Sequence, residues 1–239
     1  MRLNKFIAHC GVCSRRKAAE LVKGGMIRVN GSIEKNPAYE VQQKDKVFYK
    51  GKRLYRQRKM IYVLMNKPKN VVTTTSDEKA RKTVMDIIQP KVSQRIYPVG
   101  RLDRNTTGLL LLTNDGQLAK RLTHPSFGVK KRYHVVLDKV VPPEHLKAIK
   151  KGLKLEDGVA EVDDIDWIIG SDNSEIGIEI HMGKNRIVRR IFESLGYTVL
   201  KLDRVYYGGL TKKDLPRGWF RHLKREEVIM LKHFTQDKK

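Results

Sequence analysis

Two spacings of apolar residues recur along this chain, and together they predict a mixture of helices and strands. Near the N-terminus, Leu3, Phe6 and Ile7 and then Ala18, Leu21 and Val22 recur at intervals of three and four, which is typical of helices with one buried face. Residues 131–137 and 175–182 instead alternate apolar and polar positions, which is typical of strands with one buried face. A chain with both patterns is predicted to have an α+β fold.

Glycine, proline and capping residues set the ends of further predicted elements. Residues 27–29 read as a short strand, and the Asn30-Gly31 pair after it is a strong signal for a hairpin turn. A short apolar strand is predicted over residues 61–65. The remaining predicted helices cover residues 83–88, 115–122, 143–152 and 187–195.

The central stretch, residues 97–116, reads YPVGRLDRNTTGLLLLTNDG. Four consecutive leucines, residues 109–112, predict a strand that is buried on both faces. The loop before that strand presents Arg101 and Asp103, and residues 114–116 are polar residues of the kind that open a helix. A single carboxylate on a loop is most often solvated or a capping residue, so this pattern alone does not assign it a function.

Positive charge changes this interpretation more than any other compositional feature. The chain has 50 Lys and Arg against 26 Asp and Glu, a formal net charge of +24, and 40% hydrophobic residues, enough for a packed core. Such an excess of one sign favours binding to a polyanion, with nucleic acid the first candidate and an anionic membrane the second. No run approaches the roughly 18 apolar residues of a membrane span, and no signal-peptide core is evident. We therefore expect a soluble, cytoplasmic protein.

Residues 1–58 carry close to half of the net charge, with 15 Lys and Arg against four Asp and Glu. Arg15, Arg16 and Lys17 lie at the start of the second predicted helix, and Lys23 lies at its end. A helix face that is merely solvated would mix both signs of charge. Residues 50–59, KGKRLYRQRK, are interpreted as a basic linker, which places a domain boundary between residues 58 and 59. The second predicted helix, which begins at Arg15, has mainly alanines on its apolar side, and this argues against a membrane-surface protein.

Two clusters of potential metal ligands are interpreted without a metal. Cys10 and Cys13 have the C-x-x-C spacing, but a structural zinc site needs about four ligands and the chain has no second cysteine pair. The carboxylates of residues 156–166 alternate with Val159, Val162 and Ile165, which places them on the outer faces of strands. We expect two half-buried thiols and no metal.

The string GRLD, residues 100–103, resembles motif II of the pseudouridine synthases of the RsuA/RluB family, which act on ribosomal RNA. The resemblance implies that Asp103 is the catalytic residue. Residues 2–31 resemble the αL RNA-binding module first seen in a small-subunit ribosomal protein. The implied fold is therefore a small RNA-binding module over residues 1–58 followed by a synthase domain over residues 59–239, with a mixed, mainly antiparallel sheet and flanking helices.

Two more residues receive catalytic roles from the resemblance. Lys131-Arg132-Tyr133 matches the family's K-x-Y element, whose tyrosine stacks on the target uracil. Arg189 matches the basic residue of motif III, which pairs with the catalytic Asp and would keep its carboxylate ionised. Helical spacing predicts that Arg189 lies opposite the apolar face of its helix. Relatives often have Gln where this chain has Ile187, which puts one polar contact in doubt.

The remaining candidate site residues are expected to contact RNA. Arg101 would fill the gap that the extruded base leaves, and Lys67-Pro68 matches motif I, where the pair supports the catalytic loop. The predicted RNA-binding residues are Arg15, Arg16, Lys17, Lys23, Lys67, Arg101, Arg186 and Arg190.

The resemblance implies a monomeric enzyme whose partner is ribosomal RNA and whose reaction needs no cofactor, because isomerisation transfers neither electrons nor groups. Residues 185–190 favour large-subunit RNA or its precursor over small-subunit RNA. Two alternatives stay open: a synthase for small-subunit RNA, and a catalytically silent RNA-binding factor for ribosome assembly. Asp103 could act as a nucleophile or remove a ribose proton.

Overall fold

The computed structural model describes residues 1–57 and 59–234. The chain divides into two compact units, Met1–Met60 and Ile61–Lys239. Each unit has a hydrophobic core of its own.

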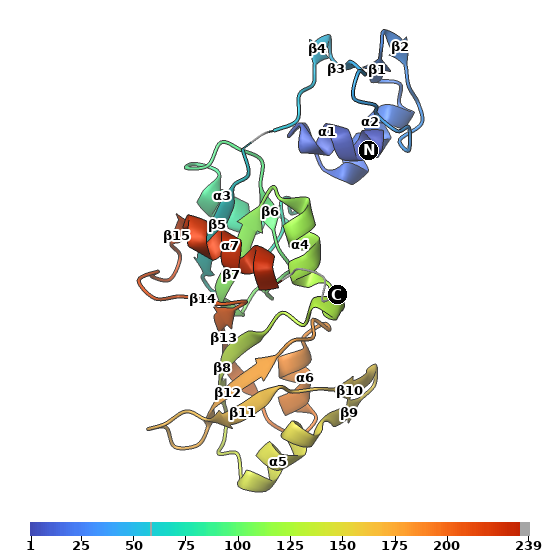
Figure 1. Ribbon diagram of the computed structural model, residues 1–239. Coiled ribbons are helices and arrows are strands. Elements are labelled where there is room, and N and C mark those ends of the chain that lie inside the picture. The colour runs from blue at the N-terminus through green and yellow to red at the C-terminus, as the bar shows by residue number, and fades with distance from the viewer. Residues whose placement is uncertain (58, 235–239) are drawn as a thin grey trace. The chain divides into compact units, whose positions relative to one another are not determined.

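The N-terminal unit packs two helices, α1 (Leu3–His9) and α2 (Arg15–Lys23), beside a four-stranded sheet of order β2-β1-β3-β4 (Figure 1). The strands are β1 (Ile27–Val29), β2 (Ser32–Ile33), β3 (Val47–Tyr49) and β4 (Lys52–Arg53). The side chain of Ser14 caps α2 by accepting a hydrogen bond from Lys17 N at 3.1 Å. Apolar side chains from both helices meet those of β1 and β3 in one core. The predicted helix faces and the β1–β2 hairpin are confirmed.

The basic segment predicted as a linker is part of this sheet over its first residues. β4 pairs antiparallel with β3, and the turn between them is Lys50-Gly51, with φ of +48° and +73°. Positive φ at both positions is the geometry of a two-residue hairpin turn, which the high charge of the segment hides from a search for apolar periodicity. Residue 58 of this segment lies outside the described residues.

The second unit is built on a nine-stranded sheet whose main path runs β11-β12-β8-β13-β7-β5-β15. Its strands are β5 (Tyr62–Lys67), β6 (Tyr97–Pro98), β7 (Thr107–Thr113), β8 (Lys131–Leu137), β11 (Asp164–Trp167), β12 (Glu175–Ile180), β13 (Val199–Tyr207), β14 (Leu210–Thr211) and β15 (Phe220–His222). A separate hairpin joins β9 (Leu153–Leu155) and β10 (Gly158–Ala160). The pairings are mainly antiparallel, as expected, and β7 with β13 runs parallel.

The run of four leucines lies in β7 and is buried on both faces of the sheet. Leu110 and Leu112 pack in a core with α3 (Val84–Ile88), and Leu109 and Leu111 pack in a second core with α4 (Gly116–Thr123) and α7 (Arg225–Phe234). Because side chains alternate between the two faces of a strand, an unbroken apolar run requires cover on both sides. The predicted two-sided burial is confirmed.

The half of the sheet around β8 is covered on one face. Tyr133, Val135 and Leu137 share their core with α5 (Pro143–Lys151) and α6 (Ile187–Glu193). The opposite face of β8 and β12 is polar: His134 pairs with Glu175 at 2.6 Å, and Arg132 pairs with Glu179. This is the alternation that the sequence predicts for β8.

The hydrophobic pattern does not predict β13, although it is nine residues long and lies between β8 and β7. Its burial does not alternate cleanly. The cause is two irregularities in its pairing with β8, between Val199 and Lys201 and between Arg204 and Tyr206, each of which shifts the side chains that face the core.

Candidate active site

A cleft of about 440 Å³ opens in the second unit where the loop before β7, the strands β8 and β13 and the start of α6 come together. It brings Asp103, Tyr133 and Arg186 to one site although they lie far apart in sequence. The loop before β7 supplies Asp103, β8 supplies Tyr133, and the residue that precedes α6 is Arg186. The sheet therefore places the strongest sequence motif and the K-x-Y element around one cavity.

Lys67, the last residue of β5, holds the backbone of the loop that carries Asp103. The Lys67 ammonium donates hydrogen bonds to the carbonyl oxygens of Arg104 at 3.3 Å, Thr106 at 2.9 Å and Pro68 at 3.0 Å. Burial lowers the pKa of Lys67 to about 8, and the nearby Asp103 carboxylate partly opposes that shift. The loop is thus fixed through its backbone by a cation that solvent does not reach.

The prediction that Lys67 contacts RNA is wrong, because its side chain is fully buried. The other role that the resemblance to motif I implies, support of the loop that carries Asp103, agrees with the inward direction of the Lys67 ammonium. Lys67 supports the loop that carries Asp103.

Arg186 forms the ion pair with Asp103, with its Nη1 at 3.7 Å from the Asp103 carboxylate. Its other terminal nitrogen lies 3.1 Å from Glu193 in α6. The Arg186 backbone has φ of +46°, a left-handed conformation that is uncommon for a residue with a side chain. About 40% of both Asp103 and Arg186 is exposed, so the pair faces the solvent of the cleft.

Arg189 does not lie on an exposed helix face, and this part of the prediction is wrong. Its side chain is buried and donates a hydrogen bond from Nη1 to the carbonyl of Val199 at 2.9 Å. Burial lowers the pKa of Arg189, and Arg186 adds to that effect while Asp103 opposes it. Arg189 and Asp103 therefore interact electrostatically, but the residue that forms an ion pair with Asp103 is Arg186.

The physical reason is that α6 is short and buried on several sides. Ile187, Val188, Ile191 and Phe192 all pack in the core, so the helix is buried over more than one narrow face, and only Arg190 and Glu193 among its residues reach solvent. The assumption of one apolar face holds for helices at the surface, and α6 is inserted between the sheet and the β9–β10 hairpin.

Behind Asp103, the wall of the cleft is formed by Tyr133 with two cations. Tyr133 lies opposite Arg204 in the pairing of β8 with β13. The buried Arg204 guanidinium donates from Nε to the carbonyl of Leu109 at 2.7 Å and lies over the ring of Tyr207 at 4.7 Å. Lys131 donates to the carbonyl of His181 at 2.6 Å, and burial, with the charge of Arg204, lowers the pKa of Lys131 to about 8.

The cleft is strongly cationic. Of the described residues that line it, Asp103 is the only acidic one. The basic residues that line it are Arg101, Arg104, Lys131, Lys184, Arg186 and Arg204. One carboxylate among six cations favours a negatively charged ligand.

The other predicted RNA contacts have different surroundings. Arg101 is exposed at the edge of the cleft. Arg190 turns away from it and forms an ion pair with Asp157, so a carboxylate of its own chain already takes up that charge. The four predicted cations of α2, Arg15, Arg16, Lys17 and Lys23, are exposed on the N-terminal unit.

One cleft residue, Arg204, escapes prediction from the sequence pattern. Its signal is weak: three charged residues, Lys201, Asp203 and Arg204, interrupt the apolar run of residues 199–207, and the last two are adjacent. A charged pair inside a strand costs desolvation unless it is hydrogen-bonded, so such a pair marks a position with a structural or functional demand.

The two groups of potential metal ligands are engaged in other ways. Burial raises the pKa of the Cys10 thiol to about 11, which keeps it in the protonated form that binds metals poorly. Asp163 pairs with His181 at 2.8 Å and Asp164 with Lys150 at 3.2 Å. Across residues 1–57 and 59–234, no three His, Cys, Asp or Glu side chains are grouped so that they could hold a metal ion. No helix in the same ranges has the length and apolar character to cross a membrane.

Comparison with known protein families gives matches over both units. Residues 61–194 match the family model described as RNA pseudouridylate synthase, and residues 1–47 match the S4 domain. The ribosomal large subunit pseudouridine synthase B of Bacillus subtilis (strain 168) is 40% identical over 234 residues, which cover 97% of this chain and 95% of the relative. An uncharacterized RNA pseudouridine synthase of Aquifex aeolicus is 37% identical, with 97% and 93% of the two chains covered.

A solved structure agrees with these sequence matches. The crystal structure of a pseudouridylate synthase superimposes with a TM-score of 0.69 at 28% identity and covers 97% of this chain and 99% of its own. Sequence identity, coverage and fold all agree with the resemblance of the GRLD segment, and this chain belongs to the RNA pseudouridylate synthase family.

Proposed function

We propose that this isomerase converts a specific uridine of large-subunit ribosomal RNA to pseudouridine, with Asp103 as the catalytic carboxylate. The observation that carries the proposal is the position of Asp103 as the one acid among six basic residues in a cleft that Tyr133 also lines. The phosphates of an RNA ligand neutralise the six cations, and the reaction requires the carboxylate of Asp103.

The reaction breaks the bond between the ribose and N1 of uracil and forms a bond from the same ribose carbon to C5. The uracil gains a proton at N1 and loses the proton at C5, so atoms and electrons balance without a co-reactant. Asp103 acts either by attacking the substrate as a nucleophile or by removing a ribose proton, and both roles require an ionised carboxylate. Arg186 forms an ion pair with that carboxylate at 3.7 Å, and the other cations line the same cleft.

Tyr133 and Arg101 serve the extrusion of the base. The target nucleotide must leave the RNA stack, which costs a few kcal/mol. An aromatic ring such as that of Tyr133 returns about 1–3 kcal/mol per stacked base. Arg101 is exposed at the edge of the cleft and long enough to occupy the gap in the stack.

The exposed cations of α2 hold the RNA backbone and leave the reading of sequence to the second unit. Contacts to phosphate position a protein on RNA and carry no sequence information of their own. The match of residues 1–47 to the S4 domain agrees with this role. The proposed form is a monomer that acts in the cytoplasm.

The preference for large-subunit RNA rests on the relative from Bacillus subtilis, whose name assigns it to the large ribosomal subunit and which is 40% identical over nearly the full chain. Small-subunit RNA is the second candidate substrate, and the test below uses fragments of both.

The test compares Asp103→Asn with wild type on ribosomal RNA fragments, with pseudouridine measured by mass spectrometry. Asn keeps the shape of Asp103 but cannot act as nucleophile or proton acceptor, so we expect the rate to fall at least about a thousandfold, or ~4 kcal/mol, while the Kd for RNA stays within about threefold. Asp214→Asn is the matched control, because Asp214 is exposed and its φ of +56° suits asparagine. Turnover near the wild-type rate in Asp103→Asn would contradict the catalytic role of Asp103, and no turnover by wild type on either fragment would favour a catalytically silent RNA-binding factor.

A further inference from the structure

The loop that carries Asp103 and the strand that carries Tyr133 are joined through a narrow contact. β7, which follows the loop, pairs with β13 through two residue pairs, Thr107 with Asp203 and Gly108 with Arg204. β13 in turn pairs with β8, where Arg204 lies opposite Tyr133. The separation between Asp103 and Tyr133 therefore depends on how Thr107 and Gly108 sit against β13.

Gly108 shows how closely the two strands approach. A Cβ atom at this position would lie 2.3 Å from the carbonyl oxygen and 2.6 Å from the nitrogen of Arg204, and the backbone has φ of +101°. Any other residue would clash with the neighbouring backbone and be strained as well. The contact leaves no room for adjustment, so it sets one register between the strands.

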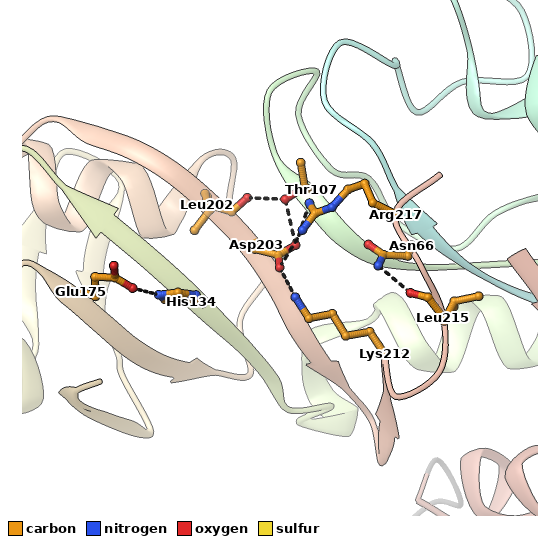
Figure 2. A network of polar contacts seen from close by, with 9 residues as sticks. All are labelled: Asn66, Thr107, His134, Glu175, Leu202, Asp203, Lys212, Leu215 and Arg217. Atoms are coloured by element: carbon orange, nitrogen blue, oxygen red, sulfur yellow. Dashed lines mark hydrogen bonds and ion pairs between the residues drawn. The ribbon is translucent and has the colours of Figure 1, made fainter. Parts of the chain in front are cut away.

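Asp203 is the side chain that holds this contact (Figure 2). It is 9% exposed, and its Oδ1 accepts a hydrogen bond from the Thr107 hydroxyl at 2.8 Å. Lys212 also donates to the carboxylate, and Arg217 approaches both oxygens at 3.2 Å. Burial would raise the pKa of Asp203, but the hydrogen bonds from Lys212 and Thr107 outweigh it and hold the pKa below its usual range.

The three donors come from two parts of the chain. Thr107 is the first residue of β7. It directly follows the turn that carries Asp103, in which Thr106 N donates a hydrogen bond to Asp103 O at 3.1 Å. Lys212 and Arg217 belong to the segment after β14. Asp203 thus joins the catalytic loop to the centre of the sheet on one side and the C-terminal segment on the other.

We propose that Asp203 is a positioning residue, which through the Thr107 hydroxyl fixes the Asp103 loop in register with Tyr133. The proposal rests on the catalytic role of Asp103 proposed above. The alternative role for Asp203 is to anchor the C-terminal segment through Lys212 and Arg217, with no influence on the loop.

The first experiment changes Thr107 and leaves Asp203 intact. Thr107→Val keeps the shape and removes the hydroxyl, whereas Thr107→Ser keeps the hydroxyl and removes a methyl group. We expect kcat for Thr107→Val to fall tenfold to about a hundredfold, because an error of about 1 Å in a reacting group can cost that much, with the Kd for RNA within about twofold. Thr107→Ser should stay within about threefold of wild type. If packing mattered and the hydrogen bond did not, the order of the two variants would be reversed.

The second experiment is a double-mutant cycle of Asp203→Ala with Thr107→Val, measured as single-turnover rates. If Asp203 acts through Thr107, the double variant should be no slower than the slower single variant, within about twofold. Independent roles would instead multiply the two losses. Glu227→Gln is the matched control, because it removes a bidentate ion pair with Arg221 in the same unit but away from the loop. We expect it to lower the melting temperature and leave kcat unchanged.

The two proposals fail in distinguishable ways. An inactive Asp103→Asn together with wild-type kcat in Thr107→Val, or multiplied losses in the cycle, would overturn the role of Asp203 and leave that of Asp103 standing. An active Asp103→Asn would overturn both.

Discussion

The two units of this protein place positive charge in opposite ways. On α2 of the N-terminal unit, Arg15, Arg16 and Lys23 are exposed. In the second unit, Lys67 and Arg204 are buried and donate to backbone carbonyls of the loop before β7 and of β7 itself. Arg189 is buried in the same manner against the carbonyl of Val199.

This difference divides the net charge of +24 into two functions. An exposed cation stays hydrated and is available to phosphate at little cost. Burial of a cation costs desolvation free energy, as the lowered pKa of Lys67 shows. The three hydrogen bonds from the Lys67 ammonium to backbone carbonyls offset that cost. We therefore expect exposed cations to serve binding, and the buried Lys67 to hold the backbone of the loop before β7. The two kinds should respond differently to mutation.

The largest effect is expected from Lys67→Met, which removes the donor to three carbonyls of the loop region. The loop should lose its fixed backbone, and kcat should fall about a hundredfold, with the Kd for RNA little changed. The free energy of unfolding should also fall, by roughly 1–3 kcal/mol for the carbonyls left without a donor. Lys69→Met is the control, because Lys69 is exposed two residues away. Equal effects of the two variants on kcat would remove the distinction between buried and exposed cations.

The same lysine predicts a dependence on pH. With its pKa lowered to about 8, the Lys67 ammonium loses a proton as the pH rises above 8, and a neutral amine has two donors for three carbonyls. The rate should decline reversibly above about pH 8. Lys131 has a pKa of about 8 as well and remains in Lys67→Met, so the decline should become smaller in that variant and not vanish. An alkaline decline of unchanged size in Lys67→Met would exclude Lys67 as its source.

An intermediate effect, on binding, is expected from deletion of residues 1–60, the N-terminal compact unit. Binding should weaken by about tenfold to a hundredfold at moderate salt, and the dependence of log K on log salt should flatten by about 0.7 to 0.9 per lost phosphate contact. The remaining unit has its own cores and should stay folded and convert a short substrate slowly. An unchanged salt slope would mean that the exposed cations of α2 do not contact the RNA.

The smallest effect separates two neighbouring arginines. Arg186→Met removes the ion-pair partner of Asp103 at 3.7 Å, and we expect kcat to fall about tenfold, or ~1.4 kcal/mol. Arg189→Met should mainly lower the free energy of unfolding, by about 1–3 kcal/mol, because Val199 loses its buried donor. Arg190→Met, which breaks the pair with Asp157 outside the cleft, is the control. A larger fall of kcat in folded Arg189→Met than in Arg186→Met would show that Arg189 is the partner that Asp103 depends on.

The sequence predicts the elements whose patterns are regular and misjudges side chains whose environment is set by distant segments. β8 alternates as expected because only one of its faces is covered, and β7 is apolar throughout because both of its faces are covered. The inward direction of Arg189 depends on the burial of α6, and that of Lys67 depends on the loop before β7. β13 is missed because its bulges break the alternation. Local patterns report periodicity, but they do not report what a charged residue meets across the sheet.

The most direct test of the central claim, that Asp103 in the cationic cleft isomerises uridine in large-subunit ribosomal RNA, is a map of pseudouridines in ribosomal RNA. The map would compare cells that lack the gene with the same cells complemented by wild type or by Asp103→Asn. We expect a specific pseudouridine in large-subunit RNA to disappear with the gene, to return with wild type, and to stay absent with Asp103→Asn produced at the same level. Return of the modification with Asp103→Asn, or an unchanged large-subunit map in cells without the gene, would contradict the claim.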